Sequence, residues 1–488
     1  MRRTPRSRRA VGLTAAALLL LVSACTGAKA PRALTEQSAP PDATADASAP
    51  GATAPSASAA ASASASAAAS RGTTQAGGRT TAGPGGTRVP AGGGGAEKPR
   101  DVAGDLNLFP GALNTRGISN DEIVICGHAA LTYGPAFGTS EKDFRVFWDA
   151  LNARGGIYGR KVTFSLENDN YEPTTAVQAA TTCQGKNPFA ILGGIGFDQI
   201  PAVRNWAEQH KELYLYHDAT ANGAAGKQYS FSSLPTVERF GEMFAQLAVA
   251  KFRTKKIGIL YRNSEFWDPG YKAFMKIAKA EKLNVVAAIP VENKQEHYDQ
   301  EMQAMRDKGA EVVWAWENAL AATEIINQAP PGYRPSYMVF PFNLTTQTLL
   351  DSGLDLYGIA SWPAYSYHDY SGDFASYVAD IKEFEQQYAA YDSSIDLSGV
   401  GGDLLFLNWV GQKELAQRLF DCGRACTRNH FATLLTRYRG AVRPNCYADF
   451  AGRGGHLGGS AVNLFHSYTG PSGKLGWKPL AKCVNTIR

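Results

Sequence analysis

Few residues of this 488-residue sequence have the spacing that covalent chemistry needs. His217 stands beside Asp218, as in half of a nucleophilic triad, but no serine or cysteine partner is identifiable. Cys422, Cys426 and His430 are spaced almost like metal ligands, yet the second cysteine pair of a structural zinc site is missing. No serine nucleophile elbow, zinc-protease helix or phosphate loop occurs. The residues therefore favour binding over catalysis and predict no enzyme, bound metal or cofactor.

The N-terminus has the pattern of an export signal. The first nine residues hold five arginines and no acid, and the apolar run from Val11 to Val22 ends in Ser23, Ala24 and Cys25. That run is too short to cross a bilayer, which takes about 20 residues. The ending Val22-Ser23-Ala24-Cys25 resembles a bacterial lipobox, in which the cysteine receives lipid. We expect a signal peptide over residues 1–25 and a lipid anchor on Cys25 at the outer face of the cell membrane. A leftover thiol is the alternative, and Ser7-Arg8-Arg9 leaves Sec and twin-arginine export both open.

Charge excludes several partners. The chain has 49 Lys and Arg, and removal of the five signal arginines leaves 44, equal to the 44 Asp and Glu. A formally neutral mature protein has no global field that gathers nucleic acid or anionic lipid. We therefore expect a small-molecule partner and no nucleic acid.

Six cysteines remain after Cys25, an even number in an exported chain, so disulfides are expected. Six cysteines allow fifteen pairings. Chain order suggests Cys126 with Cys183, Cys422 with Cys426, and Cys446 with Cys483. The metal interpretation of Cys422 and Cys426 remains the alternative.

Residues 26–104 are rich in Ala, Ser, Gly, Pro and Thr and almost lack aromatic residues, so they cannot bury a core. As a flexible coil the segment would span about 50 Å. We interpret it as a disordered tether between the lipid and the folded part, residues 105–488.

The folded part alternates predicted strands and helices in two series. It is too long for one small core and has no apolar stretch that could span a membrane. The predicted fold class is α/β, with two doubly wound Rossmann-like lobes joined by a hinge. Lobe 1 is expected at about 118–235 plus 366–445 and lobe 2 at about 236–365 plus 446–488. The final forty residues are predicted to be irregular with short strands. The expected strands are 122–126, 161–166, 190–193, 213–217, 256–261, 284–290, 311–316, 337–340 and 358–362, and the expected helices are 141–154, 173–183, 199–210, 269–281, 298–308, 319–329, 345–352, 374–391, 402–419 and 428–438.

Four segments carry a family resemblance. They are the opening strand with its loop 127–139, the Asn-Ala-Arg-Gly-Gly-Ile-Tyr-Gly-Arg run ending at Arg160, the helix start Tyr171-Glu172-Pro173, and Ile191-Leu192-Gly193-Gly194. Together they resemble the leucine-binding family of type I periplasmic binding proteins. An ordinary turn would explain two glycines of the second segment but not the whole ordered set.

The resemblance implies a solute held by loops that follow the strands of lobe 1. Helix starts in such loops offer unpaired N–H groups to an anion. Asp198 lies beside them, either as a ligand contact or as a cap of the following helix. The matching positions are Gly194, Gly196, Phe197, Asp218, Ala219 and Thr220, with Tyr133 and Phe137 facing the same space.

In lobe 2 the family usually has a Tyr-Gly step where this chain has Phe266-Trp267. This departure suggests a larger or flatter ligand than leucine, unless both rings merely cover the lobe. Trp316 and Glu317 follow a predicted strand, and Glu317 is a candidate partner for an ammonium group, with helix capping as the alternative. Asn343 occupies the next loop.

By resemblance, the chain is expected to be an extracytoplasmic solute-binding lipoprotein of an ABC importer. It would act as a monomer, capture a small aromatic or amino-acid-like ligand by hinge closure and present it to the permease. The alternative is a lipid-anchored sensor of the same fold that signals through a partner. Neighbouring permease and ATPase genes would favour transport over sensing.

Overall fold

The computed structural model describes residues 98–132, 141–193, 198–216, 227–339, 347–361, 365, 375–397, 399–440, 446, 448–449, 456, 459, 461–469, 473 and 475–485. The predicted signal, Cys25 and nearly all of the predicted tether lie outside these residues. No helix within them is both long and apolar enough to cross a membrane.

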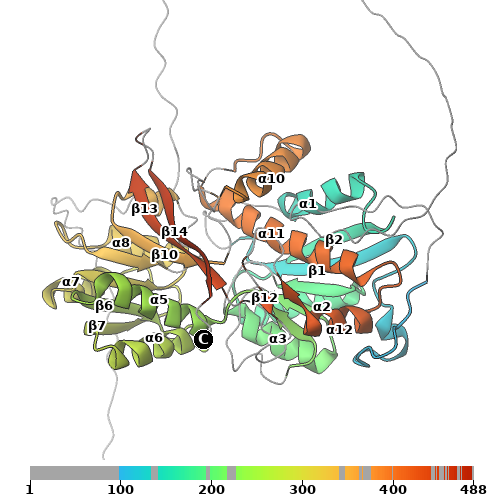
Figure 1. The fold of residues 1–488 in the computed structure, drawn as a ribbon, viewed down its shortest axis with the longest axis horizontal. Coiled ribbons are helices and arrows are strands. Elements are labelled where there is room, and N and C mark those ends of the chain that lie inside the picture. The colour runs from blue at the N-terminus through green and yellow to red at the C-terminus, as the bar shows by residue number, and fades with distance from the viewer. Residues whose placement is uncertain are drawn as a thin grey trace, which may run out of the picture. The chain divides into compact units, whose positions relative to one another are not determined.

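A first sheet of five parallel strands has the order β2-β1-β3-β4-β5 (Figure 1). Helices α2 and α3 enclose a separate apolar core against one face, around Cys126, Ile191 and Trp206. Helix α1 packs on the other face, where Trp148 contacts Phe164. The elements are β1 (Glu122–Ala129), α1 (Glu141–Ala153), β2 (Lys161–Asn168), α2 (Pro173–Gly185), β3 (Ala190–Gly193), α3 (Gln199–His210), β4 (Tyr214–Tyr216) and β5 (Ser230–Ser232).

A second sheet of seven strands has the order β14-β13-β10-β9-β8-β6-β7. Its strands β6 to β10 are parallel and repeat the order of the first sheet, because β6 lies between β7 and β8 as β1 lies between β2 and β3. The elements are α5 (Val237–Phe252), β6 (Lys256–Arg262), α6 (Asp268–Ala280), β7 (Asn284–Val291), α7 (Asp299–Asp307), β8 (Val312–Trp316), α8 (Ala319–Asn327), β9 (Ser336–Val339), α9 (Gln347–Asp351) and β10 (Leu356–Ala360).

After β10 the chain returns to the first sheet. Three helices follow, α10 (Tyr377–Tyr391), α11 (Gly399–Cys422) and α12 (Arg428–Arg437). Tyr388 of α10 donates to the carbonyl of Asp143, and Gln412 of α11 donates to that of Phe144, so both helices are fixed to α1. We call the first sheet with α1–α3 and α10–α12 lobe 1, and the second sheet with its helices lobe 2. The predicted fold class, two doubly wound α/β lobes, is confirmed.

The expectation for the C-terminus is wrong. Instead of irregular structure it holds two long antiparallel strands, β13 (Ala461–Thr469) and β14 (Leu475–Asn485), and β13 pairs with β10. Glycines around the strands suggested loops, but Phe465 and Trp477 are completely buried and anchor the hairpin on lobe 2. Short pieces complete the chain, namely η1 (Gly111–Asn114), β11 (Arg439–Gly440) and β12 (Ala448–Asp449).

Helix α5 was also absent from the expected elements. Its apolar residues Val237, Phe240, Phe244 and Leu247 recur at helical spacing, and all are buried. The side chain of Thr236 caps the helix by accepting from the backbone N–H of Arg239 at 3.3 Å. Both signals were present in the sequence.

All three expected disulfides are formed, which confirms the pairing suggested by chain order. Cys126–Cys183 joins β1 to α2, and Cys422–Cys426 closes the loop between α11 and α12. Cys446–Cys483 joins the segment between β11 and β12 to β14. Oxidised cysteines leave the metal interpretation of Cys422 and Cys426 without its thiolates.

Candidate functional site

The strand order places the candidate site. In each lobe the order reverses beside the first strand, and ligands of such sheets bind beyond the carboxyl ends of strands at that point. In lobe 1 these are the ends of β1 and β3, and in lobe 2 the ends of β6 and β8. Asp198 follows β3, Arg262 ends β6 and Glu317 follows β8.

Arg262 joins these strand ends. Its Nε and Nη2 donate to the two carboxylate oxygens of Glu317 at 2.6 and 2.7 Å, a bidentate pair within lobe 2. Its Nη1 donates to Asp198 of lobe 1 at 2.6 Å. Ser264 adds a second bond to Asp198, at 3.1 Å. The carboxyl ends of the two parallel sheets are thus connected through one guanidinium.

Burial makes this cluster electrostatically strong. Arg262 is 1% exposed and Glu317 is fully buried. Burial alone opposes the charge on Arg262, but the adjacent Glu317 carboxylate, with Tyr171 and Asp198, raises the pKa of Arg262 above its ordinary value. For Glu317, burial raises the pKa and Arg262 opposes that effect. We treat both as charged at neutral pH because the bidentate geometry satisfies each of them.

Asp198 does not cap α3, although capping was one of the two interpretations offered for it. It precedes the helix in a helical backbone conformation and makes no side-chain cap bond. Its carboxylate faces lobe 2 instead. Asn318 does act as a cap, accepting from the N–H of Ala321 at 3.1 Å at the start of α8. Glu317 is neither a surface cap nor available to an ammonium group while Arg262 holds both of its oxygens.

The aromatic candidates of lobe 2 form a packed layer behind Arg262. Phe266, Trp267 and Trp316 are each 1% exposed or less. The indole N–H of Trp316 donates to the carbonyl of Trp267 at 2.7 Å, and the two rings meet edge to face at 5.2 Å. Gly270 lies so close that a Cβ there would overlap the Trp316 ring. These rings support Arg262, whose guanidinium lies 5.6 Å from the centre of the Trp267 ring.

A buried polar chain in lobe 1 was missed by the sequence interpretation. His128 of β1 contacts Asp169 through Nδ1 at 2.7 Å and the hydroxyl of Tyr214 through Nε2 at 2.8 Å. Asp169 also accepts from Gln199 at 3.0 Å and from the N–H of Tyr171 at 2.9 Å. All five residues are at most 2% exposed. These hydrogen bonds hold the ends of β1, β2 and β4 together. In the sequence, Asp169 lies four residues before Pro173, and this spacing was the one local sign of the buried chain.

The remaining predicted ligand residues lie outside the described residues, so they stay predictions. They are Tyr133, Phe137, Gly194, Gly196, Phe197, Asp218, Ala219, Thr220 and Asn343.

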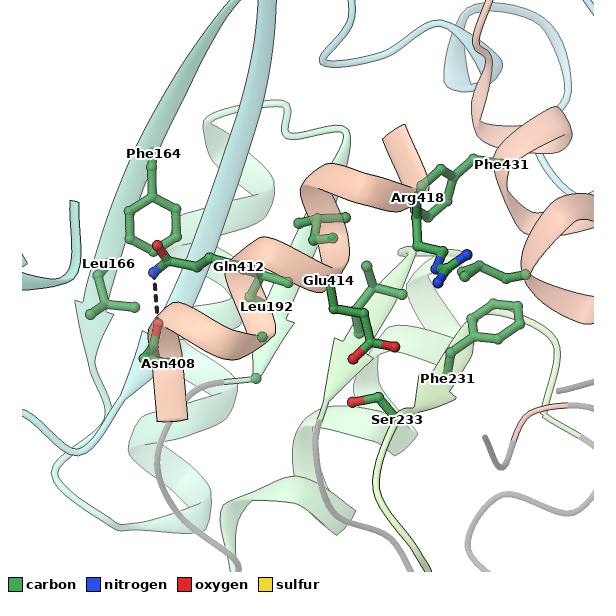
Figure 2. A pocket seen from close by; sticks show the side chains of 15 residues that line it. Phe164, Leu166, Leu192, Phe231, Ser233, Asn408, Gln412, Glu414, Arg418 and Phe431 are labelled. Carbon is green, nitrogen blue, oxygen red and sulfur yellow. Dashed lines mark hydrogen bonds between the residues drawn. The ribbon is translucent and has the colours of Figure 1, made fainter. Parts of the chain in front are cut away.

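A separate cavity of about 50 Å³ lies inside lobe 1, between the strand ends of the first sheet and helices α11 and α12 (Figure 2). We call it the α11 cavity. Its wall is mostly apolar, with a few polar groups from α11. The lining residues are Phe164, Leu166, Leu192, Gly193, Leu215, Phe231, Ser233, Asn408, Gly411, Gln412, Glu414, Leu415, Arg418, Phe431 and Leu435.

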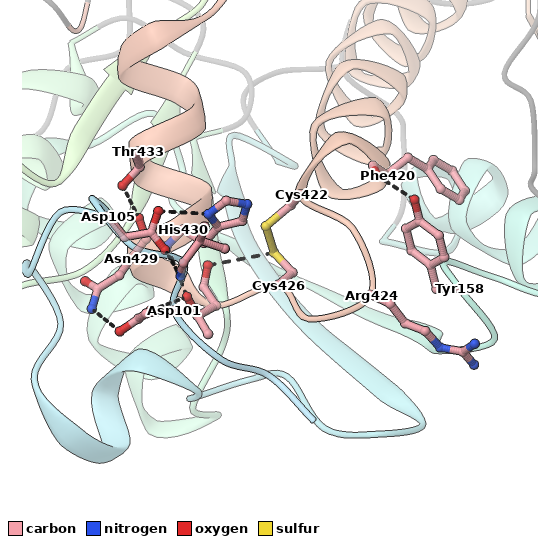
Figure 3. The surroundings of a disulfide bond; sticks show 12 residues. Asp101, Asp105, Tyr158, Phe420, Cys422, Arg424, Cys426, Asn429, His430 and Thr433 are labelled. Atoms are coloured by element: carbon pink, nitrogen blue, oxygen red, sulfur yellow. Dashed lines mark hydrogen bonds and ion pairs between the residues drawn. A yellow bond between two sulfur atoms is a disulfide. The ribbon is translucent and has the colours of Figure 1, made fainter. Parts of the chain in front are cut away.

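The start of the described chain is fastened beside the Cys422–Cys426 disulfide (Figure 3). Asp101 accepts from Thr427 at 2.7 Å, and Asp105 contacts the His430 ring at 2.9 Å. Asn429 accepts from the backbone N–H groups of Leu108 and Phe109. We call residues 98–110 the N-terminal strap. His430 is thus engaged by a carboxylate, and no described group of three or more His, Cys, Asp or Glu side chains is arranged to hold a metal ion.

These features define a two-lobed α/β binding fold with facing strand ends. The sequence model of the periplasmic binding protein family matches residues 132–407, more than half of the chain, and the protein belongs to that family. The family is that of periplasmic solute-binding proteins, which act outside the cytoplasm and are not enzymes.

Individual relatives are distant. The Leu/Ile/Val-binding protein homolog 8 of Brucella abortus is 24% identical over 298 residues, covering 57% of this chain and 71% of the relative. A fatty acid ABC transporter substrate-binding protein from Thermomonospora curvata has a TM-score of 0.60 at 15% identity. The superposition covers 76% of this chain and 94% of that protein's chain. A solute-binding protein from Rhodopseudomonas palustris, solved with 3,4-dihydroxybenzoic acid, has a TM-score of 0.60 at 14% identity, covering 75% and 98%. The structural likenesses establish the fold.

Proposed function

We propose that this protein is a lipid-anchored receptor that captures a small solute between its lobes and presents it to an ABC permease. One observation carries the proposal. The loop after β3 and the end of β6 meet through Asp198, Arg262 and Ser264, so the ligand-binding edges of both sheets face a common space.

Closure of the lobes is the proposed mechanism. Asp198 belongs to lobe 1 and Arg262 to lobe 2, so their bond forms only when the lobes approach. Glu317 holds the guanidinium from within lobe 2, which keeps it oriented for Asp198 in the absence of that bond. A solute that contacts both lobes would shift the population toward the bonded, closed form, which the permease would recognise.

The proposed ligand is aromatic or amino-acid-like. The names of the relatives support this class, since one is a Leu/Ile/Val-binding homologue and another was solved with an aromatic acid. Phe266 and Trp267 in place of the family's Tyr-Gly step make a branched-chain amino acid a poor cargo. Both rings are buried in the structure, so we propose that they affect the ligand indirectly, by supporting the residues of lobe 2 that face it.

A thermal-shift screen over amino acids, amides and aromatic acids tests ligand capture. A ligand at 100 times its Kd adds about 2.7 kcal/mol to the free energy of unfolding, a clear rise in Tm. X-ray scattering with the best compound should then show compaction. Binding without any compaction would refute closure, and absence of a shift across all three compound classes would refute the ligand class.

Membrane attachment is tested separately. The full chain expressed in a bacterial host should partition into membranes, and Cys25→Ala should release it into the soluble extracytoplasmic fraction. Equal partitioning of both forms would contradict the lipid anchor on Cys25.

A further inference from the structure

The α11 cavity contains an arginine with buried N–H donors that have no acceptor among the described residues. Arg418 is 6% exposed and projects from α11 into the cavity wall. Its Nη1 donates to Asp421 at 2.8 Å, and its guanidinium stacks on the Tyr438 ring, 3.3 Å from the centre. Its Nε and Nη2 are buried and donate to no residue in the described ranges. A buried donor without a partner is costly, and more so when it is charged.

The Nε and Nη2 groups form the edge of a guanidinium that binds a carboxylate with two parallel hydrogen bonds. Arg262 in the same chain uses this edge, holding Glu317 at 2.6 and 2.7 Å. Arg418 therefore has the donor pair that Arg262 uses, but no carboxylate of the described residues accepts from it.

Most side chains around this edge are apolar, and the Glu414 carboxylate is a charged neighbour in the same cavity wall. Figure 2 shows the Arg418 guanidinium between the rings of Phe231 and Phe431, while the Glu414 carboxylate points toward Ser233. The opposite wall is formed by side chains of the first sheet, including Leu166, Leu192 and Leu215. An anion at Arg418 would thus have hydrocarbon on its far side.

We propose that the α11 cavity is a binding site for a small monocarboxylate with an apolar chain. The carboxylate accepts from Nε and Nη2 of Arg418, and the chain extends along Leu192 and Leu215 beneath α11. The volume of about 50 Å³ exceeds the 10–15 Å³ or so that one water needs, yet it admits only a short chain. This site lies within one lobe and does not involve Arg262, so it is independent of the proposed interlobe capture.

Isothermal titration of the full chain with acetate, butyrate and hexanoate tests the proposal. Each methylene that enters the cavity should tighten binding about fourfold, because burying a CH₂ is worth about 0.8 kcal/mol. Arg418→Gln should weaken butyrate binding by about tenfold or more, since a charge-assisted pair is lost. Leu192→Trp, which fills the cavity and keeps Arg418, should also abolish the chain-length dependence.

Three matched variants distinguish binding in the α11 cavity from binding elsewhere in the protein. Asp421→Asn removes the negative charge of the partner of Nη1 and leaves the Nε–Nη2 edge, so binding should be retained within about twofold. Arg437→Gln changes an arginine of α12 outside the cavity and should have no effect. Asp198→Asn alters the interlobe contact and should leave butyrate binding unchanged. The proposal is overturned if wild type binds none of the three acids, if folded Arg418→Gln binds butyrate like wild type, or if Asp198→Asn alone abolishes binding.

Discussion

Asp198 and Arg262 lie in different lobes, 64 residues apart, and their Oδ2 and Nη1 atoms are 2.6 Å apart. Arg262 is nearly inaccessible, whereas Asp198 is 11% exposed in its side chain. Glu317 thus holds Arg262 from within lobe 2, while Asp198 contacts it from lobe 1.

Loss of Asp198 should favour an open form. Asp198→Ala leaves the Arg262–Glu317 pair intact but removes the two hydrogen bonds that Asp198 accepts from Arg262 and Ser264, so the compaction that ligand causes in X-ray scattering should be smaller than in the wild type. Glu265→Gln is the matched control, because Glu265 is largely exposed and faces Arg204 across the lobes at 3.7 Å. An unchanged scattering profile for Asp198→Ala would mean that this contact does not hold the lobes together.

Loss of Glu317 should destabilise the fold itself. Glu317→Ala leaves Arg262 buried with less compensation, which typically costs about 3–5 kcal/mol in the free energy of unfolding. Urea denaturation measures the change. Glu311→Gln, which breaks an exposed pair with Lys255, should have a much smaller effect on the free energy of unfolding, because solvent screens that pair. Equal effects of the two substitutions would contradict the structural role of the buried pair.

The disulfides should contribute unequally. Cys126–Cys183 spans 57 residues and Cys422–Cys426 spans 4, and loop-closure entropy gives about 4 and 2 kcal/mol respectively. Double Cys→Ala variants compared by urea denaturation should show the larger loss for Cys126 and Cys183. The reverse order would indicate that the short bridge stabilises the native strap contacts more than it restrains the unfolded chain.

Mild acid should destabilise the protein through His456. Burial lowers the pKa of this imidazole below its ordinary value, although a bond to the Ser230 carbonyl at 2.8 Å and Glu208 oppose the effect. A histidine with a lowered folded pKa binds its proton less readily when folded, so stability is present above the unfolded pKa near 6.5 and is lost as pH falls through that range. The fall in stability from about pH 7.5 to about pH 5.5 should be smaller in His456→Gln. An identical pH profile in both proteins would exclude His456 as the cause.

The fold was largely predictable, because the periodicity of the apolar residues indicates strands and helices and the length of the folded part indicates two lobes. Alternating strands and helices gave both lobes, and chain order gave the three disulfides. The β13–β14 hairpin was not predicted because its stability comes from pairing with β10 and from burial of Trp477, neither of which is a local property. Helix α5 had a local signal and could have been found.

The sequence predicted that β3, β6 and β8 end beside the candidate site residues, because each of these strands was expected there. It did not predict which side chains contact one another after those strands. Glu317 looked like a ligand group because its buried counter-ion, Arg262, lies 55 residues away in sequence. The same holds for His128 and Asp169, which are 41 residues apart and meet only because β1 and β2 are neighbours.

The N-terminal strap also determines where a pulling force on the N-terminal segment would enter the folded part. A pull on the chain before residue 98 would act first on Arg100, whose backbone N–H donates to the carbonyl of Ala425 at 3.1 Å, and then on Asp101 and Asp105, which contact Thr427 and His430 at the start of α12. The Cys422–Cys426 bridge covalently closes the loop just before those residues, so tension is passed into α11 and α12. The strands β1 and β3 and the bond between Asp198 and Arg262 lie off this path. If residues 26–104 form the proposed tether, drag on it would load the helices of lobe 1 and not the contact between the two lobes.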